Sequence, residues 1–350
     1  MLIGDYAMMQ LSGALASGDL WVRAGALAVY AALVVLLIVA FDYLFVWMER
    51  KAVARVQARR GPTRTGGYGL LQNLADVVKL LSKENPVPKG AQKGLFLVTI
   101  PLMLAVAIFL VMLIPLTPGL VASDLGLGAL VIFVVLSFAP LLVFLSGTSS
   151  GNKFAAIGAQ RSLIALLGYE VPLLLVVASV GMLANGYGFP GIVAAQSGGV
   201  YVVGIVAAQV KGVWFAVLMP IGCLVFFVAM LAELGRPPFD LGDAGSEISG
   251  GWLADVGAPY FALSAFLDST RMFLGCLLMA MLFFGGWSGP AVLPPVAWLL
   301  IKSFAIGLVI ALVRATLPRM RLDQMLKFCW TVLVPFAILN LIVTVMIFIV

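Results

Sequence analysis

The most regular feature of the chain is a series of long apolar stretches separated by polar segments. Eight stretches reach about 20 residues, the length a helix needs to cross the hydrocarbon core of a bilayer. Because a backbone in lipid must satisfy its own polar groups, we predict that each stretch forms a transmembrane helix. The predicted spans are 24–48, 94–116, 127–146, 161–183, 212–231, 260–284, 296–313 and 328–350.

The segment 49–93, between the first two spans, is too long for a simple connection. Part of it places apolar residues at helical spacing on one face and polar residues on the other. We therefore predict an amphipathic helix over 67–84 that lies on the membrane surface or covers the bundle. The apolar positions are Leu70, Leu71, Leu74, Val77, Val78 and Leu81.

Composition places the chain in one class. Mean hydropathy is +1.14 and charged residues make up 10% of the sequence, values typical of a polytopic helical membrane protein. We predict an all-α fold, a single membrane domain over 1–350 with eight transmembrane helices and one cytoplasmic amphipathic helix. The chain has no histidine, and Cys223, Cys276 and Cys329 are far apart in apolar spans, so we predict no metal site, disulfide or iron–sulfur cluster in this chain.

The 21 basic residues are unevenly shared between the two sides of the predicted bundle. Seventeen fall in loops on one side, ten of them in 49–93, whereas only Arg23 and Lys211 fall in loops on the other. The positive-inside rule then places the basic loops in the cytoplasm and both termini outside. The net charge of +6 is explained by this topology, so it does not indicate nucleic-acid binding.

The predicted cytoplasmic loop 232–259 carries five of the fifteen acidic residues. Ionisable residues placed among membrane spans are costly and usually mark a functional site. In the structural alternative, Asp240 caps a helix after Pro237 and Pro238, Asp243 lies near the positive end of that helix, and Glu247 shares a helix face with Asp243. Capping leaves the other carboxylates unexplained. The acidic residues are Glu233, Asp240, Asp243, Glu247 and Asp255.

Charged residues stand out in three of the predicted spans, 161–183, 260–284 and 296–313. Glu170 follows Arg161 by nine residues, or about 13 Å of helix, which places it near mid-membrane. Asp268 and Arg271 are three residues apart and form either a self-neutralising pair or part of a functional site. Lys302 has no acidic neighbour within a turn, so we expect a carboxylate partner from another helix or subunit.

Several longer motifs occur in a fixed order. They are Glu-Arg-Lys at 49–51 continuing to Gly-Pro at 61–62, Gly-Leu-Leu-Gln at 69–72 continuing to Lys-Glu at 83–84, Asn-Lys at 152–153 continuing to Tyr-Glu at 169–170, Arg-Pro-Pro-Phe-Asp at 236–240, and the run 314–324. In this order they resemble the NuoH family, the quinone-site membrane subunit of respiratory complex I. The resemblance covers about residues 24–345.

The resemblance implies a function and a set of partners. The family is a membrane subunit of proton-translocating NADH:quinone oxidoreductase. With NuoB- and NuoD-like peripheral subunits it encloses a chamber for ubiquinone or menaquinone, the substrate. NuoA-, NuoJ- and NuoK-like and antiporter-like membrane subunits complete the assembly, and its iron–sulfur clusters and FMN belong to partner subunits. The implied location is the bacterial inner membrane with both termini periplasmic; the alternative is the mitochondrial inner membrane.

The resemblance also assigns residues to three groups. The quinone chamber takes Glu49, Arg50, Arg55, Arg59 and Asp76; the proton path takes Glu170, Glu233, Asp243, Glu247, Asp255 and Asp268; and the loop motif takes Arg236 and Asp240. The chain departs from the family at Gly245, where a carboxylate is usual, and at Asp243, where Asp replaces Glu.

Two other functions remain open from the sequence. The chain could be the equivalent subunit of a membrane-bound hydrogenase or ferredoxin-linked complex, in which no quinone binds. It could also be a stand-alone transporter, although the spans show no internal repeat of the kind many transporters have.

Overall fold

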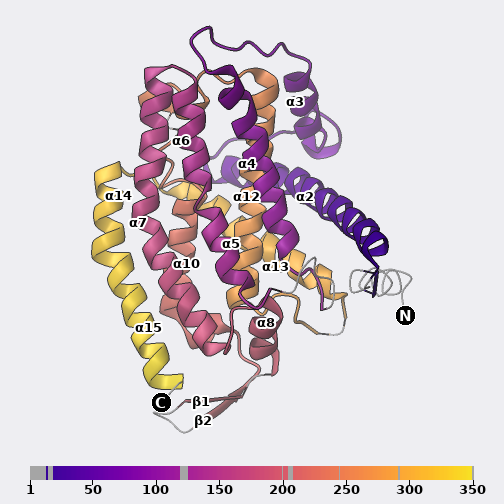
Figure 1. Cartoon of the computed structure of the whole chain (residues 1–350), viewed down its shortest axis with the longest axis vertical. Helices are drawn as coiled ribbons and strands as arrows, with labels where there is room; N and C mark the ends of the chain where they lie inside the picture. The colour runs from indigo at the N-terminus through magenta and orange to yellow at the C-terminus, as the bar shows by residue number, and fades with distance from the viewer. Residues whose placement is uncertain are drawn as a thin grey trace.

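The computed structural model describes residues 13–14, 19–118, 125–198, 200–203, 208–243, 245–290 and 292–348. Over these residues the protein is a bundle of helices that run lengthwise through the molecule (Figure 1). Seven helical stretches are long and apolar enough to cross a membrane. The prediction of an all-α membrane fold is therefore confirmed, and the count of eight is reached only if a shorter helix of 14 residues, Pro220–Glu233, is included.

The elements follow one another along the described chain with short connections. The long helices are α2 (Leu20–Val56), α4 (Lys93–Leu113), α7 (Lys153–Leu183), α12 (Ala258–Phe283) and α13 (Pro295–Thr316). The shorter ones are α5 (Gly128–Leu136), α6 (Ala139–Ser149), α8 (Phe189–Gly198), α9 (Phe215–Leu218), α10 (Pro220–Glu233) and α11 (Gly245–Ile248), with a turn η2 (Gly251–Leu253).

Proline divides two of the predicted spans. The span predicted over 127–146 consists of α5 and α6, and Pro140 lies in the first turn of α6. The span predicted over 212–231 consists of α9 and α10, and α10 begins at Pro220. Since proline has no backbone N–H, it fits the first turn of a helix, where that group would lack an intrahelical partner.

The predicted last span begins earlier and changes its winding midway. α14 (Leu322–Phe328) leads into the π-helical turn η3 (Cys329–Leu333), which continues as α15 (Val334–Phe348). Pro335 cannot donate the usual bond to the preceding turn, and a wider turn there accommodates the missing donor. Residues 349–350 of the predicted span lie outside the described residues.

The core runs along α12. Every residue of Met272–Phe283 is buried, so this helix is enclosed by its neighbours. α2 leans across the bundle beside it (Figure 1) and buries a stripe at nearly every fourth position, the spacing of one helix face. That stripe is Ala26, Tyr30, Val34, Ile38, Phe41, Asp42, Phe45, Glu49 and Ala54.

At the lower end of Figure 1, α8 leads into a small antiparallel hairpin of β1 (Val200–Val203) and β2 (Ala208–Lys211). Gln196 links α8 to the end of α12 by hydrogen bonds. Its Nε2 donates to the carbonyl oxygens of Met281 and Leu282 at 3.0 and 3.2 Å, and its Oε1 accepts from the Gly285 N–H at 2.8 Å.

Lys302 differs from its prediction. Its Nζ donates to the carbonyl oxygens of Phe284, Gly286 and Ser288 at 2.8, 2.9 and 2.6 Å. These carbonyls follow the end of α12, where the helix leaves acceptors without intrahelical donors. The expected carboxylate partner is therefore replaced by backbone oxygens, and Lys302 closes the end of α12.

The amphipathic segment lies at the opposite end of the bundle, here called the α3 end (Figure 1). A short turn η1 (Gly67–Gly69) precedes α3 (Gln72–Leu81), so the regular helix is shorter than the predicted 67–84. The buried Asn73 attaches α3 to α2 through a bond from its Nδ2 to the Tyr43 carbonyl at 3.0 Å. The apolar side chains left exposed are Leu71, Leu74, Val77, Val78 and Leu81.

Candidate functional site

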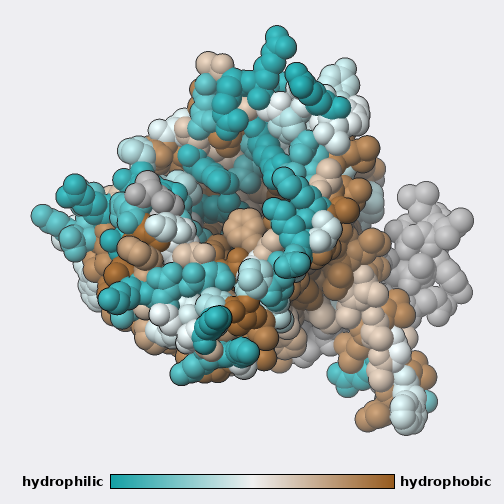
Figure 2. Space-filling model, turned by 90° about the horizontal axis from the view of Figure 1, so that it is seen from above, coloured by the Kyte–Doolittle hydropathy of each residue, from teal (hydrophilic) through white to brown (hydrophobic). Residues whose placement is uncertain are grey.

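A cavity of about 470 Å³ lies between α7, α10, α12 and the loop that follows α10. In the view from above, which looks onto the α3 end, hydrophilic side chains surround a hollow with apolar side chains at its base (Figure 2). Four acidic residues and three arginines line the cavity: Glu233, Asp240, Asp243 and Asp268, with Arg236, Arg271 and Arg314. A charged cavity of this kind, built among apolar helices, is the candidate functional site.

The loop after α10 brings several of these groups together. Gly235, with φ of +60°, turns the chain back, and the Phe239 N–H donates to the Arg236 carbonyl at 2.9 Å. A bond of 2.9 Å from the Met320 N–H to the Pro238 carbonyl and an ion pair between Arg319 and Asp240 hold the loop against the segment before α14. The structural alternative, in which Asp240 caps a helix, does not hold, because the next helix, α11, begins only at Gly245.

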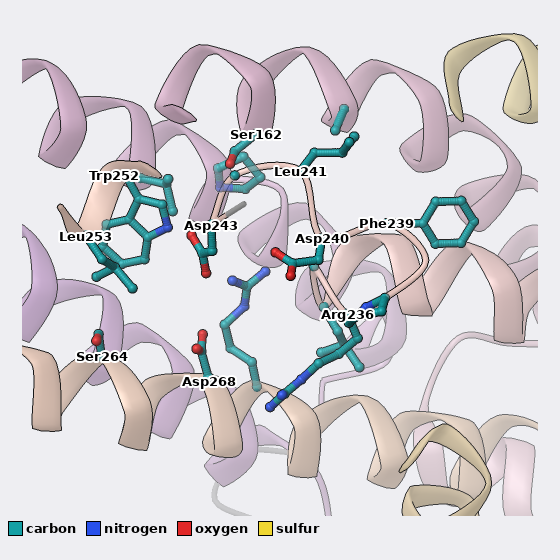
Figure 3. A pocket seen from close by; sticks show the side chains of 18 of the residues that line it. Ser162, Arg236, Phe239, Asp240, Leu241, Asp243, Trp252, Leu253, Ser264 and Asp268 are labelled. Carbon is teal, nitrogen blue, oxygen red and sulfur yellow. The ribbon is translucent and has the colours of Figure 1, made fainter. Parts of the chain in front are cut away.

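Close packing fixes the second half of the loop. A Cβ atom on Gly251 would lie 1.7 Å from the Gly242 carbonyl oxygen, and one on Gly242 would lie 2.1 Å from Ser162 Oγ on α7. Only glycine fits at such distances. This packing presents Asp243 to the cavity, where its carboxyl group points toward that of Asp268 on α12 (Figure 3).

Asp243 is placed where a negative charge is costly. Its Oδ1 is buried without a hydrogen-bond partner. Burial, together with the neighbouring carboxyl groups of Asp268 and Asp240, raises the pKa of Asp243 to about 8. Asp243 lies before α11 rather than on it, so the prediction that it shares a helix face with Glu247 is wrong.

Arg271 binds Glu233, so of the two alternatives left open for Asp268 and Arg271, the self-neutralising pair is not formed. Arg271 Nη2 lies 2.6 Å from the Glu233 carbonyl oxygen and 3.4 Å from Oε1. This contact joins α12 to the last residue of α10, and both side chains are largely buried. Asp268 instead faces the cavity (Figure 3), whose lining also includes Arg236, Arg271 and Arg314.

Glu49 joins α2 to the same cluster. Its Oε1 accepts from Arg314 Nη1 at 2.6 Å and lies 3.8 Å from Arg236 Nη1. The Glu49 side chain is 8% exposed, whereas that of Arg314 is 40% exposed. Thus one buried carboxylate holds two arginines that border the cavity.

Glu170 lies outside the main cavity but next to it. It lines a small pocket between α5, α7 and α10, together with Tyr169 and Glu233. Glu233 and Tyr169 line both this pocket and the main cavity.

The remaining predicted residues lie outside the cavity. Glu247 pairs with Arg161 at 2.7 Å in an accessible position, and Asp255 is half-buried near the start of α12. Neither lines the cavity.

At the junction of α2 and α3, Arg50 binds Asp76 at 2.7 Å. Although partial burial acts in the opposite direction, the bonds from Arg50 and Gln72 hold the pKa of Asp76 below its usual value. Arg55 and Arg59 are exposed at the end of α2. These four residues therefore lie together near the α3 end, apart from the carboxylates of the cavity.

One acidic residue was not singled out in the sequence. Asp42 is buried on α2, two turns before Glu49. Its signal was a carboxylate inside the first predicted span, which is itself uncommon.

Comparisons with known proteins agree with this architecture. A family model described as NADH dehydrogenase matches residues 28–345. The H subunit of NADH-quinone oxidoreductase from Dehalococcoides mccartyi (strain CBDB1) is 36% identical over 327 residues, covering 93% of this chain and 87% of that protein. The H subunit from Carboxydothermus hydrogenoformans is 35% identical over 302 residues, covering 85% and 82%. One of the H subunits from Syntrophobacter fumaroxidans is 36% identical over 321 residues, covering 89% and 92%. The chain therefore belongs to the NADH dehydrogenase family, among relatives named as H subunits of NADH-quinone oxidoreductase.

Proposed function

We propose that the cavity is the inner part of a chamber for a quinone headgroup, and that its carboxyl groups take up protons and pass them on. The chain then acts as the quinone-site membrane subunit of a proton-translocating NADH-quinone oxidoreductase. The observation that carries this proposal is the convergence of four acidic residues and three arginines on one space of about 470 Å³.

Charge balance gives the physical reason. Two-electron reduction of a quinone produces a dianion until protons arrive, and a negative charge at 4 Å interacts with another by about 4 kcal/mol at an effective dielectric constant near 20. Carboxyl groups in one cavity share this field and titrate together. With no histidine in the chain, carboxyl groups and water are the natural carriers of protons.

The path from the cavity leads through Glu233. This residue borders both the main cavity and the small pocket of Glu170. We propose that protons move from Asp268 and Asp243 to Glu233 and then to Glu170, and onward to NuoA-, NuoJ- and NuoK-like and antiporter-like subunits. Glu247 and Asp255 take part at the rim rather than inside the cavity.

The junction of α2 and α3 suits entry and docking. The exposed apolar face of α3 is a surface for lipid and for the quinone tail. Arg50, Arg55, Arg59 and Asp76 give the same region a polar rim, which suits contact with NuoB- and NuoD-like subunits. In this arrangement the α3 end faces the cytoplasm of a bacterium and both termini lie in the periplasm. Electrons arrive from iron–sulfur clusters and FMN held by partner subunits.

The test uses the assembled complex in membranes. Asp268→Asn and Asp243→Asn are each expected to lower quinone reduction and proton pumping about tenfold or more, the scale of a lost acid–base group. Asp323→Asn is the matched control, since Asp323 is exposed on α14 and outside the cavity. If both cavity variants keep the activity of the control, the cavity does not carry this function.

Co-purification separates the leading function from its alternative. The complex isolated in mild detergent should contain an NADH-binding subunit and reduce quinone. A nickel-containing hydrogenase subunit in its place, without quinone reduction, would favour the hydrogenase-type assembly.

A further inference from the structure

We propose that Asp42 is an additional proton-binding residue of this site, which gives up its proton when the Arg236 side chain turns from Glu49 toward Asp42. The inference rests on the proposed function, because it adds a residue to the same proton path. It is carried by the position of Asp42, which none of the roles described above uses.

Asp42 is enclosed to an unusual degree for an acid. The residue is 6% exposed, and both carboxyl oxygens are inaccessible to solvent and lack a hydrogen-bond partner. An ionised carboxylate without donors is strongly disfavoured in such surroundings. The side chain therefore needs either a proton or a cation that can approach it.

The neighbouring hydroxyl suits the protonated form. Ser269 on α12 is the polar side chain that faces Asp42. Its Oγ lies 3.1 and 3.2 Å from the carbonyl oxygens of Ala265 and Phe266 of its own helix, so its single hydrogen is already donated. A hydroxyl oxygen used in this way can still accept, and a protonated Asp42 can donate to it.

The cation that can replace the proton is Arg236. Arg236 pairs with Glu49 on α2 and lines the cavity together with Asp268 on α12, and its charge is near enough to act on Asp42. Its contact with Glu49 is long, at 3.8 Å, beyond hydrogen-bond length. Arg236 also lines the cavity, which leaves room for the side chain to reorient.

Glu49 does not depend on Arg236 for its neutralisation. It keeps the bond of 2.6 Å to Arg314 when Arg236 leaves. Asp42 and Glu49 are seven residues apart on one buried face of α2, about 10 Å along the helix, and we infer that the long Arg236 side chain reaches either by turning between them. Two carboxyl groups thus compete for one movable positive charge.

The resulting step is a balanced proton transfer. The O–H bond of Asp42 breaks, its carboxylate pairs with Arg236, and the proton passes to the carboxylate of Asp268 through water that follows Arg236 from the cavity it lines. The reverse step restores the acid when Arg236 returns to Glu49. A negative quinone product in the cavity attracts Arg236 and so opposes the forward step, which links the charge state of Asp42 to occupation of the cavity.

The test combines infrared difference spectroscopy with pumping measurements on the assembled complex. On reduction by NADH in the presence of quinone, wild type should show a change in the C=O band of a protonated carboxyl group, and Asp42→Asn should lose that change. The variant should also move fewer protons per quinone reduced. Ser303→Ala is the control, since its buried hydroxyl bonds only within α13 and its spectrum and ratio should match wild type.

The outcomes separate the two proposals. If Asp42→Asn matches Ser303→Ala in spectrum and ratio while Asp268→Asn is impaired, the role of Asp42 is overturned and the cavity function stands. If Asp268→Asn and Asp243→Asn are also unimpaired, the proposed function itself fails. Should Asp42→Asn not assemble, Asp42→Glu decides the matter, because it keeps a carboxyl group and changes only the residue that carries it. A shift of the changing C=O band in Asp42→Glu supports the role, and a band identical to that of wild type overturns it.

Discussion

Asp243 shows how the fold changes the chemistry of one side chain. Its pKa of about 8 lies above the ordinary value, so the native state favours the protonated form. The stability gained this way is complete below the ordinary pKa and is lost as pH rises through about 8. We expect the contribution of this group to lower the unfolding temperature of the purified complex progressively between about pH 4 and about pH 8, and Asp243→Asn to reduce this fall.

Asp323→Asn is the control for that measurement, since it removes a carboxylate from an exposed position. It should leave the pH dependence of the wild type intact. Equal slopes for wild type and Asp243→Asn would show that Asp243 is not the group responsible.

Two ion pairs near α2 should contribute different amounts to the free energy of unfolding. Glu49→Gln leaves Arg314 and Arg236 without their shared carboxylate, and we expect a loss of about 2 kcal/mol, less than for a fully buried pair because Arg314 reaches solvent. Asp76→Asn breaks an exposed pair with Arg50 and should cost less than about 1 kcal/mol. Thermal unfolding of the two variants provides the comparison, and an equal or reversed order would contradict it.

At the residue level, the sequence identified most of the acids but not their partners. Asp240, Asp243 and Asp268 were expected at a functional site, and all three line one cavity. The bond between Glu49 and Arg314 joins residues 265 positions apart, and no local pattern indicates such a pairing. Asp42 was missed because the sequence does not show which residues of α12 surround a single carboxylate in an apolar span of α2.

Among the elements, α3 depends on a few polar bonds for its attachment. Asn73 Nδ2 donates to the Tyr43 carbonyl, and Tyr43 Oη donates to the Leu70 carbonyl at 2.8 Å. Asn73→Ala should weaken the attachment by about 1 kcal/mol. We expect faster hydrogen exchange in α3, with Ser82→Ala, an exposed control, unchanged. Unaltered exchange in Asn73→Ala would mean that other contacts hold the helix.

Lys302 gives a second prediction for an element. Lys302→Met removes three hydrogen bonds to carbonyls at the end of α12 and should cost about 3 kcal/mol or more. The complex should unfold at a lower temperature or assemble poorly. If the partner of Lys302 were a carboxylate, neutralising that acid by a second substitution would restore the stability of Lys302→Met. Because the acceptors are backbone oxygens, we expect no second substitution of an acid to restore it.

The elements themselves were largely predictable from apolar length, because lipid requires each backbone to bond within its own helix. The breaks were harder to place. Pro140 and Pro220 can be read directly from the sequence. Proline is tolerated in many membrane helices, however, so its presence alone does not show where a span divides.

For the whole molecule, the feature that sequence could not supply is the cavity. Its walls come from α7, α10 and α12 and from the loop after α10, which is packed through the close approach of Gly242 and Gly251. The resemblance indicated which acids matter, but that Glu233 lines two neighbouring pockets emerges only from three-dimensional packing.

The orientation of the whole bundle gives the last prediction. Ser82 lies just after α3, whereas Val292, 83% exposed, lies in the connection between α12 and α13 at the opposite end. Because most basic loops belong to the α3 end, a cysteine at Ser82→Cys should react with a membrane-impermeant thiol reagent only from the cytoplasmic side, and one at Val292→Cys only from the outside. Replacing Cys223, Cys276 and Cys329 by alanine removes the background thiols. Labelling of both positions from one side would mean that they do not lie on opposite faces of the membrane. A reversed pattern would place the cavity on the periplasmic side, where the peripheral electron-carrying subunits could not reach it.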